Sequence, residues 1–227
     1  MNWAYGVTTV PERLTNLTLR TLLSLAGGGF PKPRLFVDGC NDPKPIAEKF
    51  NLEVTVRFPS LRTYGNWVLA LWELYVREPQ ADRYILFQDD IVTYKHLREY
   101  LETILYPENG YCNLYLFPQN EKRHKGEKGW YLSNQRGKSA CALMFDKAAV
   151  IALLSAKLTV EKPQNLHRGW KSIDGSIVTA MSNVGFKEYV HCPSLIQHTG
   201  TNSSMGNKKH PLAKTFKGEQ FDAMKLI

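Results

Sequence analysis

The chain has 227 residues, of which 43% are hydrophobic and 22% charged, a composition that fits one folded α/β domain and excludes disordered, fibrous and membrane classes. No segment reaches the ~18 uninterrupted apolar residues of a membrane span, and the first residues lack a secretory signal, so we expect a cytoplasmic protein. The 29 Lys and Arg residues against 21 Asp and Glu give a net charge of +8. This excess leaves two interpretations open, a polyanionic partner or an ordinary solvated surface.

Alternating strand and helix patterns fill the first third of the chain. The β-rich run 3–9 predicts a strand, and leucines at helical spacing over 11–29 predict a helix that stops at a triple glycine. The apolar run 34–39 predicts a second strand, 46–59 a short helix and a strand, and 66–79 an amphipathic helix. This alternation predicts a mostly parallel sheet that binds ligands at the carboxyl ends of its strands.

The strand predicted at 83–92 runs directly into Gln88, Asp89 and Asp90. Carboxylates at the end of a buried strand lie at the ligand edge of the sheet, where hard oxygen ligands could hold a divalent cation. The alternative is a turn or a helix N-cap, since a helical pattern follows.

The rest of the chain is less regular. We expect a polar, basic loop over 120–129 and, after 200, a polar and basic tail. The other predicted elements are a helix at 96–107, strands at 113–118 and 139–145, a helix at 146–156, and a loop leading into a helix at 172–185.

Cysteines at 40, 112, 141 and 192 lie far apart and form no C-x-x-C pair. We expect buried free thiols, as in a reducing compartment.

Three further residues could belong to a site. His198 follows a short apolar run and precedes glycine and hydroxyl residues; its imidazole could bind Mn²⁺ or a similar cation, or it could be structural. Asp174 lies in a glycine-flanked loop that opens a helix, where it could be a general base or an N-cap. Trp170 could offer a flat apolar face to a sugar or a base.

Several short motifs occur in the order found in one enzyme family. They are VTTVPER, LFVDG, YGNWVLAL, YILFQDD, GKSA, IDGSIV and PSLIQHTGTNSS, and together they span Val7 to Ser204. In this order the chain resembles GT-A glycosyltransferases, particularly the branching N-acetylglucosaminyltransferases and their small bacterial and viral relatives. The resemblance implies a single GT-A (Rossmann-like) domain over 1–227. Its nucleotide-binding half would be 1–92, its acceptor and catalytic half 93–204, and its basic tail 205–227.

The resemblance also implies roles for individual residues. Asp90 and His198 would hold Mn²⁺ or Mg²⁺, and Asp174 would be the catalytic base of a transfer from a nucleoside diphosphate sugar, such as a UDP-sugar, with inversion. Gln88 departs from the family pattern, which has an acidic residue there, so metal binding would depend more on Asp90 and His198. The donor-binding residues would be Thr8, Thr9, Arg13, Asp38, Asn66 and Asp89.

The acceptor is inferred from charge and from the resemblance together. Lys138, Arg168 and Lys171, with Trp170, would contact it. The basic surface, the reduced cysteines and the small size suggest a bacteriophage-type DNA-modifying transferase in the host cytoplasm, acting on a hydroxymethylpyrimidine flipped from the duplex. One alternative is a transferase for a surface glycan or lipid-linked sugar, which would expose an apolar patch beside a basic one. Two others are a non-catalytic nucleic-acid-binding module and a metal-dependent hydrolase, which would need a further ligand cluster.

Overall fold

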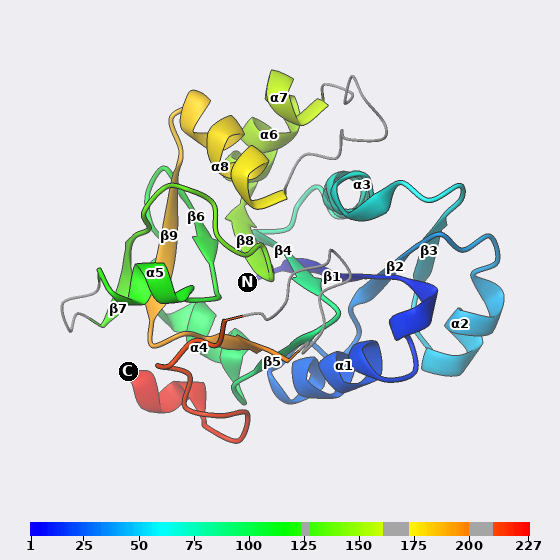
Figure 1. Ribbon diagram of the computed structural model, residues 1–227, viewed down its shortest axis with the longest axis horizontal. Coiled ribbons are helices and arrows are strands. Elements are labelled where there is room, and N and C mark those ends of the chain that lie inside the picture. Colours follow the sequence, from blue (N-terminus) through cyan, green and yellow to red (C-terminus); the bar gives the residue numbers. More distant parts are fainter. Residues whose placement is uncertain (124–127, 161–172, 200–210) are drawn as a thin grey trace.

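The computed structural model describes residues 1–123, 128–160, 173–199 and 211–227. Its centre is an eight-stranded sheet with the order β3-β2-β1-β4-β8-β6-β9-β7 (Figure 1). The strands are β1 (Trp3–Thr9), β2 (Arg34–Asp38), β3 (Val54–Arg57), β4 (Arg83–Gln88), β6 (Gly110–Asn113), β7 (Gly129–Leu132), β8 (Ala142–Asp146) and β9 (Lys187–Cys192).

The sheet is mostly parallel, as expected from the alternating pattern. β1 pairs in parallel with β2 and β4, β2 with β3, and β6 with β9, whereas β8 and β7 run antiparallel to their neighbours. Thr8 of β1 lies in register with Gln88 of β4. The carboxyl ends of these two adjacent strands therefore meet at one edge, where α/β proteins bind ligands.

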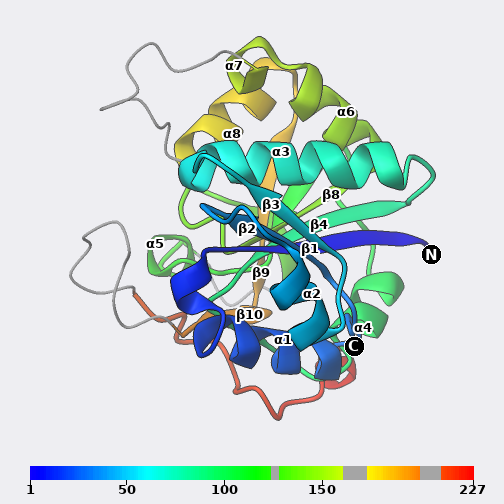
Figure 2. The same cartoon turned by 90° about the vertical axis from the view of Figure 1, so that its right-hand side faces the viewer.

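Helices cover both faces of the sheet (Figure 2). One face carries α3 (Arg62–Arg77), α6 (Lys147–Ser155), α7 (Lys157–Val160) and α8 (Ile173–Asn183), and the other carries α1 (Leu17–Gly27) and α4 (Leu97–Thr103). The shorter elements are α2 (Lys44–Phe50), α5 (Pro118–Glu121) and the 3₁₀ helices η1 (Pro11–Arg13) and η2 (Ala223–Leu226). Among the residues described, no helix combines the length and apolar character needed to cross a membrane.

A short antiparallel ribbon joins β5 (Ile91–Thr93) to β10 (Ile196–His198). Its register places His198 opposite Ile91. The hydroxyl of Thr21 in α1 donates to the Ile91 carbonyl (2.9 Å) and accepts from the Ile91 amide (3.0 Å), which fixes the ribbon against α1. The ribbon thus brings residue 198 to the residues that follow β4.

The strand predicted at 113–118 is wrong in its position. β6 ends at Asn113, and the amide of Tyr115 donates to the Asn113 side-chain carbonyl (3.1 Å) instead of to a neighbouring strand. Leu114 and Leu116 are nonetheless fully buried, which explains an apolar run typical of a strand. The loop predicted at 120–129 begins inside α5 and ends at the start of β7.

The last described segment, 211–227, packs on the domain. Phe216 stacks on Tyr94 with ring centroids 4.7 Å apart.

The four cysteines are free thiols, as expected, and all but Cys40 are buried.

Candidate functional site

Asp89 and Asp90 form a buried acid pair directly after β4, each with 3% of its surface exposed. The Thr9 hydroxyl donates to Asp89 Oδ2 (2.6 Å). Arg13 Nη1 donates both to Asp89 Oδ1 (2.7 Å) and to Asp90 Oδ2 (3.0 Å). Thr9 and Arg13 reach the pair because β1 lies beside β4 and ends at the same edge, with η1 following at once. Three residues predicted around the donor, Thr9, Arg13 and Asp89, are therefore brought together.

Opposing electrostatic effects act on this cluster. Burial raises the pKa of Asp89 and the Asp90 charge adds to the rise, while Arg13 and the Thr9 hydrogen bond act against it. Burial lowers the pKa of Arg13, but the charges of Asp89 and Asp90 outweigh it, so the net shift is upward. The guanidinium thus stays cationic between two carboxylates that are removed from water.

His198 meets the acid pair from the other end of the chain. Its Nε2 lies 3.3 Å from Asp90 Oδ2, and it is 4% exposed. The amide of Thr199 donates to the Asp90 carbonyl (2.7 Å), which secures the approach of the two segments. The pair of Asp90 and His198 predicted from the sequence is therefore in contact.

This pair suits a divalent cation. A carboxylate and an imidazole are donors that Mn²⁺ accepts, and two protein ligands leave coordination positions for phosphate oxygens. Within residues 1–123, 128–160, 173–199 and 211–227, no group of three or more His, Cys, Asp and Glu residues forms a metal site. Among the described residues, the ligands of such a centre would therefore be Asp90 and His198, which leaves it open to a substrate.

Asp174 lies in the first turn of α8, and its carboxylate is held by backbone amides. Its Oδ2 accepts from Ser139 N (2.7 Å) and its Oδ1 from Ala140 N (2.9 Å). Gly137, at φ +60°, lies against the Asp174 backbone carbonyl, where a side chain would clash. Asp174 thus fixes the segment before β8, and its role as a base stays a prediction.

Cys141 connects the two carboxylate sites. Burial chiefly raises the pKa of its thiol, and the charges of both Asp90 and Asp174 add to the rise. Its carbonyl accepts from Gln88 N (2.8 Å), so Cys141 lies beside the end of β4. The acid pair and Asp174 therefore share one neighbourhood. Cys141 directly follows the Gly-Lys-Ser-Ala motif, and no local sequence pattern marks its thiol as part of a site.

A buried glutamate, missed from the sequence, lies behind the Asp174 segment. Asn113 Nδ2 donates to Ser139 O (2.9 Å), to Lys138 O (3.2 Å) and to Glu188 Oε1 (3.3 Å). Glu188 is 2% exposed. Burial raises its pKa to about 7 against hydrogen bonds that lower it, and the Asp174 charge adds to the rise. Nothing in the surrounding run KEYVHC distinguishes Glu188 from a surface strand residue.

Asp38 is engaged in a structural contact. Its carboxylate accepts from the Ser60 hydroxyl (2.6 Å) and from Leu61 N (2.7 Å). It thereby orders the approach to α3 from the carboxyl end of β2. Its predicted contact with the nucleotide stays a prediction.

The remaining predicted residues have varied positions. Asn66 is buried between α3 and β2 and donates to Phe36 O (3.2 Å), while the Thr8 hydroxyl donates to Phe87 O (3.4 Å). Lys138 lies in the segment held by Asp174. Arg168, Trp170 and Lys171 lie outside the described residues.

Comparisons with known proteins identify the fold. No protein-family model matches the chain, and no curated protein sequence matches it. The structure is similar to a crystal structure of GalNAc-T7 with UDP, GalNAc and Mn²⁺, with a TM-score of 0.58 and 10% identity over 87% of this chain. This chain spans 44% of the length of that one.

A second similar structure is mannose-1-phosphate geranyltransferase from Thermus thermophilus. The TM-score is 0.50 and the identity 16%, over 84% of this chain and 74% of that one. At these identities the likeness concerns the fold alone, and it confirms the expected GT-A-like, Rossmann-like α/β fold.

Proposed function

We propose that this protein is a metal-dependent glycosyltransferase that moves a sugar from a UDP-sugar to a hydroxyl acceptor. The observation that carries the proposal is the buried contact between Asp90 and His198, formed by residues 108 positions apart at the ligand edge of the sheet. The fold shared with a UDP- and Mn²⁺-bound transferase supports it. Such a centre, when loaded with Mn²⁺ or Mg²⁺, stabilises the charge of the leaving diphosphate.

Asp174 is the proposed base. In the proposed step the acceptor oxygen bonds to the anomeric carbon as the bond to the diphosphate breaks, and the acceptor proton passes to the Asp174 carboxylate. UDP leaves with the electron pair of the broken bond, and the anomeric configuration inverts. The Ser139 and Ala140 amides each occupy one acceptor site on the carboxylate. Since a carboxylate has about four such sites, the others remain for the proton.

Modified DNA is the proposed acceptor, and basic residues on the Asp174 side support it. Asn120 Oδ1 accepts from Asn134 N (2.9 Å), which ties the end of α5 to the segment leading to Lys138. Phosphate contacts need such clustered positive charge. Among the described residues, the exposed basic side chains in this region are Lys122, Arg123, Lys128 and Arg136.

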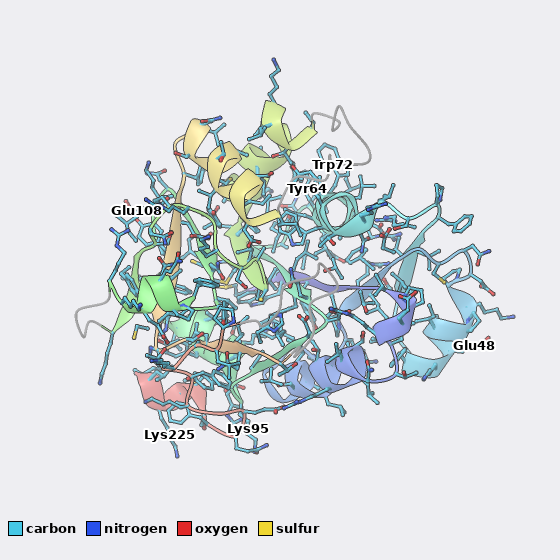
Figure 3. The ribbon with its side chains drawn as sticks, viewed as in Figure 1. Glu48, Tyr64, Trp72, Lys95, Glu108 and Lys225 are labelled. Carbon is cyan, nitrogen blue, oxygen red and sulfur yellow. The ribbon has the colours of Figure 1, made fainter. Side chains whose placement is uncertain are left out.

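A specific observation favours the second candidate, a lipid-linked or membrane-associated acceptor. Leu69, Trp72 and Val76 are 44%, 47% and 59% exposed and follow helical spacing on the outer side of α3. Trp72 lies on the side of α3 turned away from the sheet (Figure 3). Arg62 and Arg77 flank this apolar stripe. A lipid acceptor predicts this combination of apolar and basic surface.

The test is UDP release in the presence of Mn²⁺ with a panel of UDP-sugars. The acceptor arms are hydroxymethylcytosine DNA, unmodified DNA, anionic vesicles carrying a polyprenyl-phosphate sugar, and buffer alone. Release that needs modified DNA supports the DNA acceptor, and release that needs the vesicles supports the lipid-linked one. Release with buffer alone indicates hydrolysis. DNA binding without release from any donor would favour the non-catalytic nucleic-acid-binding module.

A further inference from the structure

The contacts of Arg13 point to a positioning role at the acid pair, and the inference rests on the proposed function. A single guanidinium nitrogen, Nη1, lies 2.7 Å from Asp89 Oδ1 and 3.0 Å from Asp90 Oδ2. The side chains of Asp89 and Asp90 are 4% and 5% exposed, and that of Arg13 is 18% exposed. The positive charge therefore bridges two carboxylates in a site from which water is largely excluded.

Two adjacent buried carboxylates repel each other strongly without a counter-charge, because burial strengthens the repulsion and removes hydration. Asp90 Oδ2 receives both Arg13 Nη1 at 3.0 Å and His198 Nε2 at 3.3 Å. The oxygen that would bind a cation together with His198 is thus the oxygen that Arg13 neutralises. A guanidinium and a divalent cation therefore compete for Asp90 Oδ2, because the two positive groups repel each other there.

We propose that Arg13 takes the place of the cation in the metal-free protein. Its guanidinium holds Asp89 and Asp90 in position, and cation binding between Asp90 and His198 displaces it from Asp90. Thr9 and Arg13 still bind Asp89, so Asp89 keeps its position after the exchange. This exchange lowers the affinity for a free divalent cation, because each cation that binds must displace the Arg13 guanidinium from Asp90.

The experiment is a titration of the metal-free protein with Mn²⁺ alone, followed by electron paramagnetic resonance. The Arg13→Gln variant is expected to bind Mn²⁺ about tenfold more tightly than the wild-type protein, because a positive charge within a few ångströms of the cation is gone. Its metal-free form is expected to melt at a lower temperature and to gain more from Mn²⁺. Arg20→Gln, an exposed residue on α1 with 58% side-chain exposure, is the matched control for net charge.

The sign of the change separates the exchange from a merely structural role. If Arg13 only ordered the site, its loss would weaken Mn²⁺ binding, so equal or weaker binding overturns the inference. Arg13→Lys keeps the charge and is expected to stay within about threefold of wild type. The failure of the proposed function is distinguishable, because it appears as absent UDP release in the wild-type protein whatever the Arg13 variants show.

If Arg13→Gln does not fold, side-chain NMR of the wild-type protein supplies the second measurement. Saturation with Mg²⁺ is expected to shift the Arg13 Nη resonances, because the contact with Asp90 is lost while the contact with Asp89 remains, and unchanged Nη resonances overturn the inference.

Discussion

The acid pair of Asp89 and Asp90 is held by side chains, whereas Asp174 is held by backbone amides. Side chains from two distant segments reach the pair, Thr9 and Arg13 from one and His198 from the other. The positive charge of Arg13 offsets the negative charges of the two carboxylates. Asp174 instead accepts two amides from one adjacent segment and fixes the loop before β8. We therefore expect the acid pair with Thr9, Arg13 and His198, the charge-held site, to be sensitive to bound ions. Asp174 with the Ser139 and Ala140 amides, the amide-held site, should be sensitive to the backbone that supplies those amides.

The largest expected effect is on the charge-held site. Asp90→Asn removes the carboxylate that would hold the cation with His198, and we expect UDP release to fall by about 10³-fold or more, since a bound cation contributes several kcal/mol of leaving-group stabilisation. The measurement is metal-dependent UDP release, with the melting temperature as a check on folding. Asp42→Asn makes the same change at an exposed turn and should keep full activity. Wild-type rates in Asp90→Asn would remove the metal centre from the mechanism.

The amide-held site gives the next largest effect. Asp174→Asn keeps the size of the side chain but removes the proposed base, so kcat should fall by about 10²- to 10³-fold. Because the substituted amide would also weaken the contacts to Ser139 and Ala140, the matched control is Asp146→Asn. Asp146 caps α6 by accepting from Ala149 N (2.7 Å). That control should lose about 1 kcal/mol of stability and retain activity. Equal activity losses in the two variants would assign Asp174 a structural role only.

The charge-held site could be predicted from the sequence in outline, because its residues follow regular patterns. A strand that ends in Asp89 and Asp90 places carboxylates at the ligand edge, and the fold that puts β1 beside β4 follows from the alternation of strands and helices. The contact of His198 with Asp90 depends on the register of β5 with β10, which no local pattern encodes. The resemblance supplied that link.

The surroundings of Asp174 could not be predicted in the same way. Backbone amides carry no sequence signal, so the contacts from Ser139 and Ala140 appear only in three dimensions. Glu188 lies in a strand between ordinary neighbours, and its burial follows from the packing of β9 beside β6. The misplaced strand at 113–118 has the same origin, because the Asn113 side chain ends β6 after an apolar run has begun.

A third effect concerns stability near the amide-held site. Burial raises the pKa of Glu188 to about 7, while an exposed glutamate titrates at about 4.3. The folded state therefore keeps this proton to higher pH than the unfolded state does. The resulting stabilisation of the fold is complete below the unfolded-state pKa of about 4.3, and it is lost as pH rises through the folded-state pKa of about 7. Glu188→Gln removes the titration, and the wild-type protein should lose about 3 kcal/mol relative to this variant between about pH 4 and pH 8.

The measurement for Glu188 is urea unfolding across that pH range. The control is Glu108→Gln, an exposed residue that should leave the pH dependence unchanged. If wild type and Glu188→Gln keep a constant difference in unfolding free energy at every pH, the pKa of Glu188 is the same in the folded and unfolded protein, and burial does not raise it.

The smallest expected effect tests how much the Thr9 hydrogen bond stabilises the Asp89 charge in the charge-held site. The Thr9 hydroxyl donates to Asp89 Oδ2 (2.6 Å) and lies 2.8 Å from the Thr18 hydroxyl. Thr9→Val leaves a buried charged acceptor without that donor and should cost about 1–3 kcal/mol of unfolding free energy. Thr18→Val makes the same isosteric change one contact further from the carboxylate and should cost less. If the two costs are equal, the hydroxyl pair stabilises the contact between β1 and α1 rather than the Asp89 charge.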